Sequence, residues 1–219
     1  MSDLNLAFSE FLSQVPWVVH AFGVGPCDVS DIAEGDIRYF DTKQVHGKRV
    51  ACLDDQKEGS VLTADAFMAS EPGLVCYVRT ADCVPILIAD RGNRAVAAVH
   101  AGWKGTALDI AGETVREMER AYGTDPADCV AAIGPGICGS CYEVGFDVID
   151  GLESLDIAPD WRVDDRHVDL GLANVSLLAR AGVREIDFIR VCTACDGRFA
   201  SWRRDRTPSR QVNIILINK

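Results

Sequence analysis

The segment Thr80–Gly123 constrains the fold of this chain more than any other. Within it, two short apolar runs at residues 84–89 and 95–99 are separated by a turn, which is typical of interior strands of a sheet. Apolar residues then recur at helical spacing as far as Gly123, which can take the left-handed conformation that ends many helices. We therefore expect two buried strands followed by one long amphipathic helix that begins at Thr106.

Chemically active side chains stand at the ends of these two predicted strands. Cys83 directly precedes the first strand and His100 directly follows the second. If the strands pair antiparallel, the thiol and the imidazole meet at one edge of the sheet, where α/β proteins commonly carry their chemistry. Lys104 lies in a glycine-rich turn at the start of the predicted helix, a place that suits a bound phosphate.

The length and composition favour one globular domain over residues 1–219. With 48% apolar and 25% charged residues, the chain can bury a substantial core, and no linker or change in composition divides it. We expect an α/β fold with a mixed sheet flanked by helices. We also expect residues 199–204 to form a strand, and residues 211–217 to complete the sheet.

The net charge of −11 argues against non-specific nucleic-acid binding, which requires a basic surface. No apolar run is long enough to span a bilayer, and the N-terminus lacks the pattern of a signal peptide. These features predict a cytoplasmic protein with small-molecule partners and no membrane partner. We expect a monomer or a small homo-oligomer.

His46, Cys83 and His100 form a candidate metal site, because each stands at a predicted strand end beside a turn. One thiolate and two imidazoles are a known ligand set for catalytic zinc, in which water or substrate takes the fourth position. Blue copper uses the same ligands with a weak axial methionine, but Met118 is expected in the helix core. Several copper centres would need more imidazoles than the four histidines supply. Without a metal, Cys83 and His100 could act as a nucleophile and its base.

Two aspartates are candidates for work beside these ligands. Asp65 and Asp82 each end a Thr-Ala-Asp triplet near a predicted strand. A carboxylate there could orient an imidazole or act as a general base. Two arginines near the C-terminus, Arg203 and Arg210, are candidates for contacts with an anion or a substrate.

The nine cysteines include two C-x-x-C pairs, at residues 138 and 141 and at residues 192 and 195. About fifty residues separate the pairs, whereas zinc ribbons place roughly 15–20 between theirs. On spacing alone, the sequence disfavours a shared metal site of these four cysteines.

Seven short motifs, in order along the chain, resemble those of the YfiH family, which is also called the laccase-domain or polyphenol oxidase family. The motifs are Gln44–Gly47, Ala81–Pro85, His100–Gly105, Ile133–Ile137, Cys141–Gly145, Cys192–Thr193 and Ser201–Arg204. The resemblance covers residues from about 40 to the C-terminus. The chain departs from the family at Phe22–Gly25, where an arginine-containing segment is usual.

This resemblance implies a YfiH-like fold of the cysteine-hydrolase type, with zinc held by His46, Cys83 and His100. It also implies phosphorolysis of adenosine, inosine and methylthioadenosine, together with deamination of adenosine. Within the same family, amidase-like hydrolysis of peptidoglycan precursors and copper-dependent polyphenol oxidation are alternatives. A metal-binding module without enzymatic activity is a further alternative.

Overall fold

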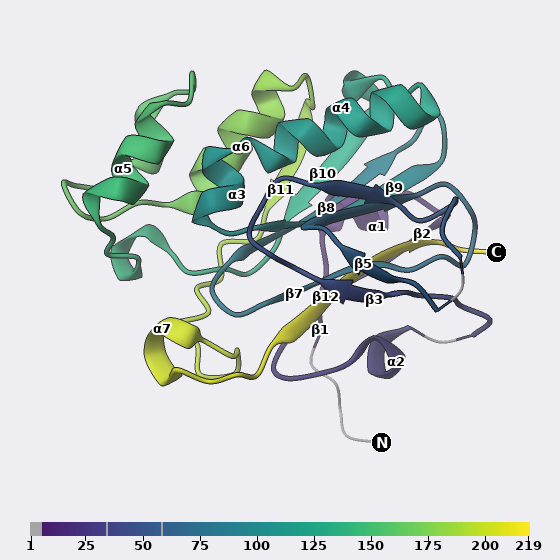
Figure 1. Ribbon diagram of the computed structural model, residues 1–219, viewed down its shortest axis with the longest axis horizontal. Helices are drawn as coiled ribbons and strands as arrows, with labels where there is room; N and C mark the ends of the chain where they lie inside the picture. Colours follow the sequence, from purple (N-terminus) through teal and green to yellow (C-terminus); the bar gives the residue numbers. More distant parts are fainter. Residues whose placement is uncertain (1–5, 34, 58) are drawn as a thin grey trace.

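The computed structural model describes residues 6–33, 35–57 and 59–219, and arranges them as two packed sheets flanked by helices (Figure 1). The larger sheet has the order β11 (Glu185–Phe188), β10 (Cys129–Ile133), β8 (Val84–Asp90), β9 (Ala95–Ala101), β6 (Ala66–Ala69) and β4 (Val50–Cys52). The smaller sheet has the order β1 (Leu6–Ala7), β2 (Val18–Gly23), β12 (Gln211–Ile217) and β7 (Cys76–Thr80). A separate parallel pair joins β3 (Asp41–Lys43) and β5 (Val61–Thr63).

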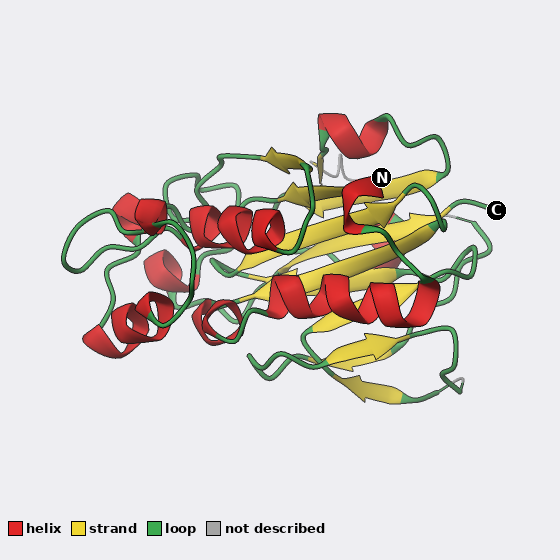
Figure 2. Cartoon of the chain, turned by 90° about the horizontal axis from the view of Figure 1, so that it is seen from above, coloured by secondary structure: helices red, strands yellow, loops and turns green. Residues whose placement is uncertain are grey.

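The helices lie mainly over the outer face of the larger sheet, where Figure 2 shows the longest of them running along the strands. They are α1 (Glu10–Ser13), α2 (Val29–Ile32), α3 (Trp103–Ala107), α4 (Ile110–Tyr122), α5 (Phe146–Glu153), α6 (Leu170–Arg180) and α7 (Trp202–Asp205). Three short 3-10 turns are η1 (Pro126–Asp128), η2 (Gly139–Cys141) and η3 (Pro159–Trp161). The predicted architecture, a mixed sheet flanked by helices, is therefore confirmed in class.

The larger sheet is buried on both faces, which explains why its strands are continuously apolar. Along β8, Ile86 and Ile88 pack with the helices, whereas Leu87 and Ala89 pack against the smaller sheet. Successive side chains of a strand point to opposite faces, so one unbroken apolar run fills both cores. The presence of two sheets in place of the single expected one follows from this double burial.

The two central strands pair antiparallel, which is the condition under which Cys83 and His100 meet. Val84 of β8 lies opposite Ala101 of β9, and Pro85 lies opposite His100. This register places the residue before β8 and the last residues of β9 side by side, at the same end of the two strands. The ends of these strands therefore deliver Cys83 and His100 to the same place.

The single long helix expected after β9 is wrong in its start, because the segment forms two helices. α3 follows Gly102 directly, and α4 begins only after Asp109, whose backbone has a φ of 58° and whose carboxylate accepts the Gly112 N–H. Thr106 does not cap a helix start. It is fully buried inside α3, and its hydroxyl accepts a hydrogen bond from the Asn174 amide.

The strand expected at residues 199–204 is also wrong. Ser201 caps a helix by accepting the N–H of Arg204, and residues 202–205 form α7. The Arg204 guanidinium donates to backbone carbonyls of Thr193 and Phe199, which fixes α7 against the loop after β11.

In the part of the chain that the structure describes, no helix combines the length and the apolar character needed to cross a bilayer.

Candidate active site

Three side chains from distant parts of the sequence converge where the central strands β8 and β9 of the larger sheet meet their loops. His46 comes from the loop after β3, Cys83 from the turn before β8, and His100 from the end of β9. One ligand atom from each lies within 4.8 Å of the others. The Cys83 Sγ is 4.0 Å from the His46 Nε2, and the two imidazole centroids are 4.7 Å apart in an edge-to-face arrangement.

One buried carboxylate, that of Asp65, holds both imidazole segments in place. Its Oδ1 lies 2.9 Å from the His100 Nδ1, and the Asp65 side chain has no exposed surface. The same carboxylate accepts the backbone N–H groups of Val45, His46 and Gly47. His46 takes a left-handed φ of 59°, which aims these successive N–H groups at a single anion.

Of the two aspartates raised by the sequence, Asp65 is thus the one that orients an imidazole. The Asp82 carboxylate accepts hydrogen bonds from the Thr193 hydroxyl, at 2.7 Å, and from the Arg203 backbone N–H, at 2.6 Å. These contacts tie the turn before β8 to the loop after β11 and to α7. Asp82 also has a φ of 81°, which is unfavourable for a residue other than glycine, so these hydrogen bonds are needed to hold the turn in this conformation.

The glycine at the start of α3 leaves room for the cluster. A Cβ placed on Gly102 would lie 3.0 Å from the His46 Cδ2 and 3.1 Å from the Cys83 Sγ. These separations are tighter than normal carbon contacts, so any larger residue here would press on two of the three side chains. The α3 backbone therefore forms one wall of the cluster.

The charges in the cluster support one another. Burial alone would raise the pKa of the Cys83 thiol, but the neighbouring His100 and His46 lower it to about 6. Burial would lower the pKa of His100, but the Cys83 sulfur and the Asp65 carboxylate raise it to about 9. Near neutral pH and without a metal, the pair is therefore a thiolate beside an imidazolium.

The cluster lies in the wall of a cavity of about 650 Å³, a size that accommodates small-molecule ligands. Two aromatic rings, those of Tyr142 and Trp202, also line it, and both are packed against arginine guanidinium groups. The remaining lining residues are Thr42, Gln44, Arg79, Ala81, Asp82, Ile137, Leu170, Arg203, Arg206 and Arg210.

Four arginines surround this cavity in a protein of net charge −11. None of the four forms an ion pair with a carboxylate among the described residues. Arg203 and Arg210, expected from the sequence, line the cavity together with Arg79 and Arg206, which the sequence analysis missed. Arg79 and Arg206 stand in no recognisable motif, so only the fold places them here.

Lys104 is placed differently from the arginines. It is exposed, it does not line the cavity, and its ammonium group lies over the Trp103 ring. Its assignment as a phosphate contact remains a prediction.

The three clustered side chains are a suitable donor set for one zinc ion. A thiolate and two imidazoles are ligands that zinc accepts, and three protein ligands leave one position open. Asp65 supplies the hydrogen bond to the far ring nitrogen of His100 that metal-bound imidazoles commonly make. These residues could therefore hold a metal without rearrangement of the backbone.

Comparisons with known proteins show the family of this chain. Residues 31–218 match the family described as "Multi-copper polyphenol oxidoreductase laccase". A purine nucleoside phosphorylase of Deinococcus radiodurans is 39% identical over 165 residues, which cover 74% of this chain and 63% of that protein. The purine nucleoside phosphorylase YfiH of Escherichia coli is 36% identical over 181 residues, which cover 80% of this chain and 72% of that protein.

Adenosine deaminase RL5, from an unknown prokaryotic organism, is 34% identical over 170 residues, which cover 70% of this chain and 64% of that protein. Among solved structures, the hypothetical protein YfiH of Bacillus licheniformis superposes with a TM-score of 0.86 at 27% identity, over 100% of both chains. YlmD of Geobacillus stearothermophilus superposes with a TM-score of 0.81 at 26% identity, over 94% of this chain and 93% of that one. The match over residues 31–218 and these relatives show that this chain belongs to the laccase-domain family that includes the YfiH proteins.

Proposed function

We propose that this protein is a zinc-dependent purine nucleoside phosphorylase that acts on adenosine, inosine and methylthioadenosine, and that it also deaminates adenosine. The observation that carries the proposal is the convergence of His46, Cys83 and His100 in the wall of an arginine-lined cavity. The relatives named as purine nucleoside phosphorylases and as an adenosine deaminase support it.

In this proposal His46, Cys83 and His100 hold the zinc ion, and Asp65 fixes their orientation. A zinc ion bound there supplies a Lewis acid that lowers the pKa of water to about 7, which suits hydrolytic deamination. Asp65 keeps the Nδ1 of His100 occupied, so that the Nε2 faces the Cys83 side of the cluster. The protein thus fixes ring orientation before any substrate binds.

The arginines supply the binding site for phosphate. Phosphorolysis forms a bond between a phosphate oxygen and the sugar C1′ and breaks the bond from C1′ to the base, which leaves with a proton. Guanidinium groups match phosphate oxygens in charge and geometry. Arg79, Arg206 and Arg210 form no ion pair with a carboxylate among the described residues. The Arg79 Nη1 donates to the Thr42 and Tyr77 hydroxyls, and the Arg210 Nη1 donates to the Thr207 and Ser209 carbonyls. The other N–H groups of these two arginines, with those of Arg206, can donate to a phosphate.

Arg203 has a different part in this arrangement. Its guanidinium donates to the backbone carbonyls of Cys141 and Glu143 and packs over the Tyr142 ring. It therefore holds the aromatic wall against which a purine ring can stack. We assign it to positioning of that wall and not to the phosphate itself.

The direct test incubates the purified protein with inosine and inorganic phosphate and follows release of the free base. The expected result is base release that depends on phosphate and falls at least tenfold in His46→Ala. Arg206→Ala should raise the KM for phosphate, because Arg206 lines the cavity. Lys104→Ala tests the phosphate contact predicted for Lys104: a raised KM would support that contact, and an unchanged KM would leave the anion to the cavity arginines. No base release from adenosine, inosine or methylthioadenosine would reject the proposal.

A second candidate function is amidase-like hydrolysis with Cys83 as nucleophile. The observation that favours it is the position of the Cys83 sulfur beside the His46 and His100 imidazoles in the cavity wall. These neighbours lower the pKa of the Cys83 thiol to about 6, so a thiolate is available without a metal. An acylated Cys83 trapped with a muramyl amide substrate in chelator-treated protein would favour this candidate. The copper oxidase alternative is supported by the description of the matched family. Several copper centres would need more imidazole ligands than are gathered here, because only one of the two candidate metal clusters among the described residues contains histidine.

A further inference from the structure

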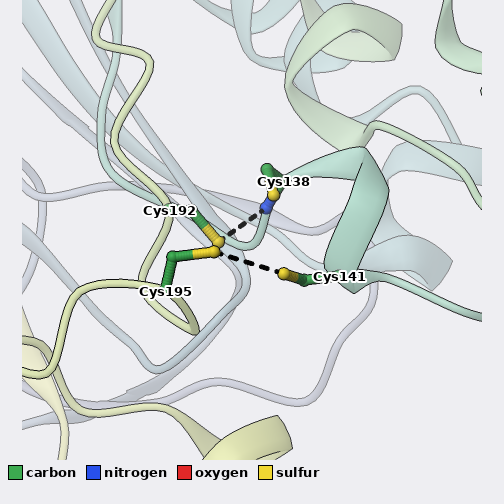
Figure 3. A group of neighbouring side chains, drawn as sticks. All are labelled: Cys138, Cys141, Cys192 and Cys195. Atoms are coloured by element: carbon green, nitrogen blue, oxygen red, sulfur yellow. Dashed lines mark hydrogen bonds between the residues drawn. The ribbon is translucent and has the colours of Figure 1, made fainter.

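A second cluster of metal-ligating side chains lies outside the three-residue cluster of the candidate active site. It consists of Cys138, Cys141, Cys192 and Cys195, which are hereafter called the four-cysteine cluster. Their sulfur atoms all lie within 4.8 Å of one another (Figure 3). All four cysteines are free thiols.

The parallel pairing of β10 and β11 brings the two C-x-x-C pairs together. Ile133 at the end of β10 lies opposite Phe188 at the end of β11. The loops that follow the two strands therefore leave the sheet side by side. Beyond the strands the two loops stay paired. The Gly136 N–H donates to the Val191 carbonyl, and the Thr193 N–H donates to the Gly136 carbonyl.

This topology overturns the argument from spacing. The fifty residues between the pairs form α5, η3 and α6, which leave from β10 and return to its neighbour β11. A crossover of this length separates the pairs in sequence but not in space. The sequence spacing of a zinc ribbon is therefore not required for these four thiols to meet.

Each pair also forms a tight turn that directs its two sulfurs to one side. In the first, the Cys141 N–H donates to the Cys138 carbonyl, and in the second the Asp196 N–H donates to the Cys192 carbonyl. The Cys138 N–H donates to the Cys192 Sγ at 3.3 Å, which stabilises a thiolate at that position. Figure 3 shows the two pairs facing each other across the gap between the loops.

The distances suit a shared ion. The Cys141 and Cys195 sulfurs are 3.4 Å apart, whereas a disulfide would need about 2.05 Å. Four sulfurs placed tetrahedrally at about 2.3 Å from zinc stand about 3.8 Å from one another. The observed spread, with every pair of ligand atoms within 4.8 Å, brackets that value.

We propose that the four-cysteine cluster binds a zinc ion through four thiolates, as a closed structural site separate from the candidate active site. Four-sulfur tetrahedral sites take zinc or a single iron. We commit to zinc because four protein thiolates fill its tetrahedral coordination and leave no position open, which is the pattern of structural zinc sites.

Three structural links connect the four-cysteine cluster to the residues that line the cavity. The loop that carries Cys138 and Cys141 also carries Ile137 and Tyr142, which line the cavity. The Cys141 carbonyl accepts a hydrogen bond from the Arg203 guanidinium. On the other loop, the Thr193 hydroxyl, next to Cys192, donates to Asp82. A metal here therefore fixes the part of the cavity wall that these loops and Asp82 form.

The test counts zinc in protein purified from zinc-supplemented cells, in a His46→Ala/Cys83→Ser background that disables the other cluster. We expect one zinc ion per chain in this background. It should be lost in the further variant Cys141→Ser/Cys195→Ser and retained in the matched control Cys27→Ser/Cys52→Ser, which removes two half-buried thiols outside both clusters. This count does not depend on any nucleoside activity, so its failure is distinct from failure of the proposed function.

A second measurement does not depend on the folding of the cysteine variants. X-ray absorption at the zinc edge of the His46→Ala/Cys83→Ser protein should show four sulfur neighbours at about 2.3 Å. Substitution with Co²⁺ should give the intense thiolate charge-transfer bands of a four-sulfur site. Zinc absent from this background, disulfides linking the two pairs in the purified protein, or iron in place of zinc would each overturn the proposal.

Discussion

At the scale of single residues, the Asp65 carboxylate connects the two histidine segments of the site. It joins the His100 ring to three backbone N–H groups around His46, and the pKa of Asp65 is lowered because these bonds outweigh burial. The triplet containing Asp65 pointed to it as a candidate, but an identical triplet pointed equally to Asp82. Only the fold distinguishes the aspartate that touches an imidazole from the one that ties two loops.

Asp65→Asn should therefore weaken metal binding about 10–100-fold, because the amide is a poorer partner for the His100 Nδ1–H and for the backbone N–H groups. The matched control is Asp54→Asn. Asp54 is also an N–H acceptor, bonded to Ser70, Glu71 and the Tyr122 hydroxyl, but it is not a cavity residue. Titration of each purified variant with zinc measures the affinity. Equal affinity in Asp65→Asn and the wild type would contradict the assigned role.

Gly102→Ala should reduce turnover without unfolding the protein. Its φ of −75° and ψ of 171° suit any residue, so the backbone is not strained by the substitution. The added methyl group instead presses on His46 and Cys83, which must shift by a few tenths of an ångström. We expect at least a tenfold loss of kcat for base release, with a thermal midpoint within a few degrees of the wild type. An unchanged kcat would show that this wall is not close to the working cluster.

At the scale of elements, the strands were predictable where periodicity and burial agree, and the elements set by local hydrogen bonds were not. The strands expected at residues 84–89, 95–99 and 211–217 lie within β8, β9 and β12. The apolar runs did not decide whether β8 and β9 pair antiparallel, which the structure shows. The break between α3 and α4 depends on the left-handed Asp109, and α7 depends on the cap at Ser201. Neither residue type signals these conformations uniquely.

One hydrogen bond between elements, from Ser9 at the start of α1 to His20 on β2, should make the folding stability depend on pH. His20 on β2 is buried, and its Nε2 accepts the N–H of Ser9 at the start of α1. Burial lowers the pKa of His20 to about 4, against 6.5 for the free side chain, while the Ser9 contact and the Asp187 charge oppose the shift. Between these values the unfolded chain binds a proton that the folded protein does not, so folding stability is complete above about pH 6.5 and declines towards pH 4.

The free energy of unfolding should fall by roughly 3 kcal/mol more between pH 6.5 and 4 in the wild type than in His20→Gln. Urea denaturation at several pH values measures the difference. His167→Gln is the control, since His167 is bonded to an exposed carboxylate, that of Asp164. Parallel pH profiles for the wild type and His20→Gln would contradict the buried neutral state of His20.

At the scale of the whole molecule, the order and direction of the strands determine which side chains come together in a cluster. The antiparallel pair of β8 with β9 makes the three-residue cluster, and the parallel pair of β10 with β11 makes the four-cysteine cluster. The first was predictable because both strand ends are adjacent in sequence to their active residues. The second was not, because a helical crossover hides the proximity of the cysteine pairs. The cavity arginines likewise come from β7, α7 and the loops around α7 and β12, which only the packed fold unites.

Turnover of a purine nucleoside by this protein should require a zinc ion held by His46, Cys83 and His100. The most direct measurement is phosphate-dependent base release from inosine by chelator-treated protein, before and after zinc or copper is restored. The proposed function predicts negligible release without metal and recovery with zinc, in the wild type but not in His46→Ala. Full activity of the stripped protein, or recovery with copper alone, would contradict it.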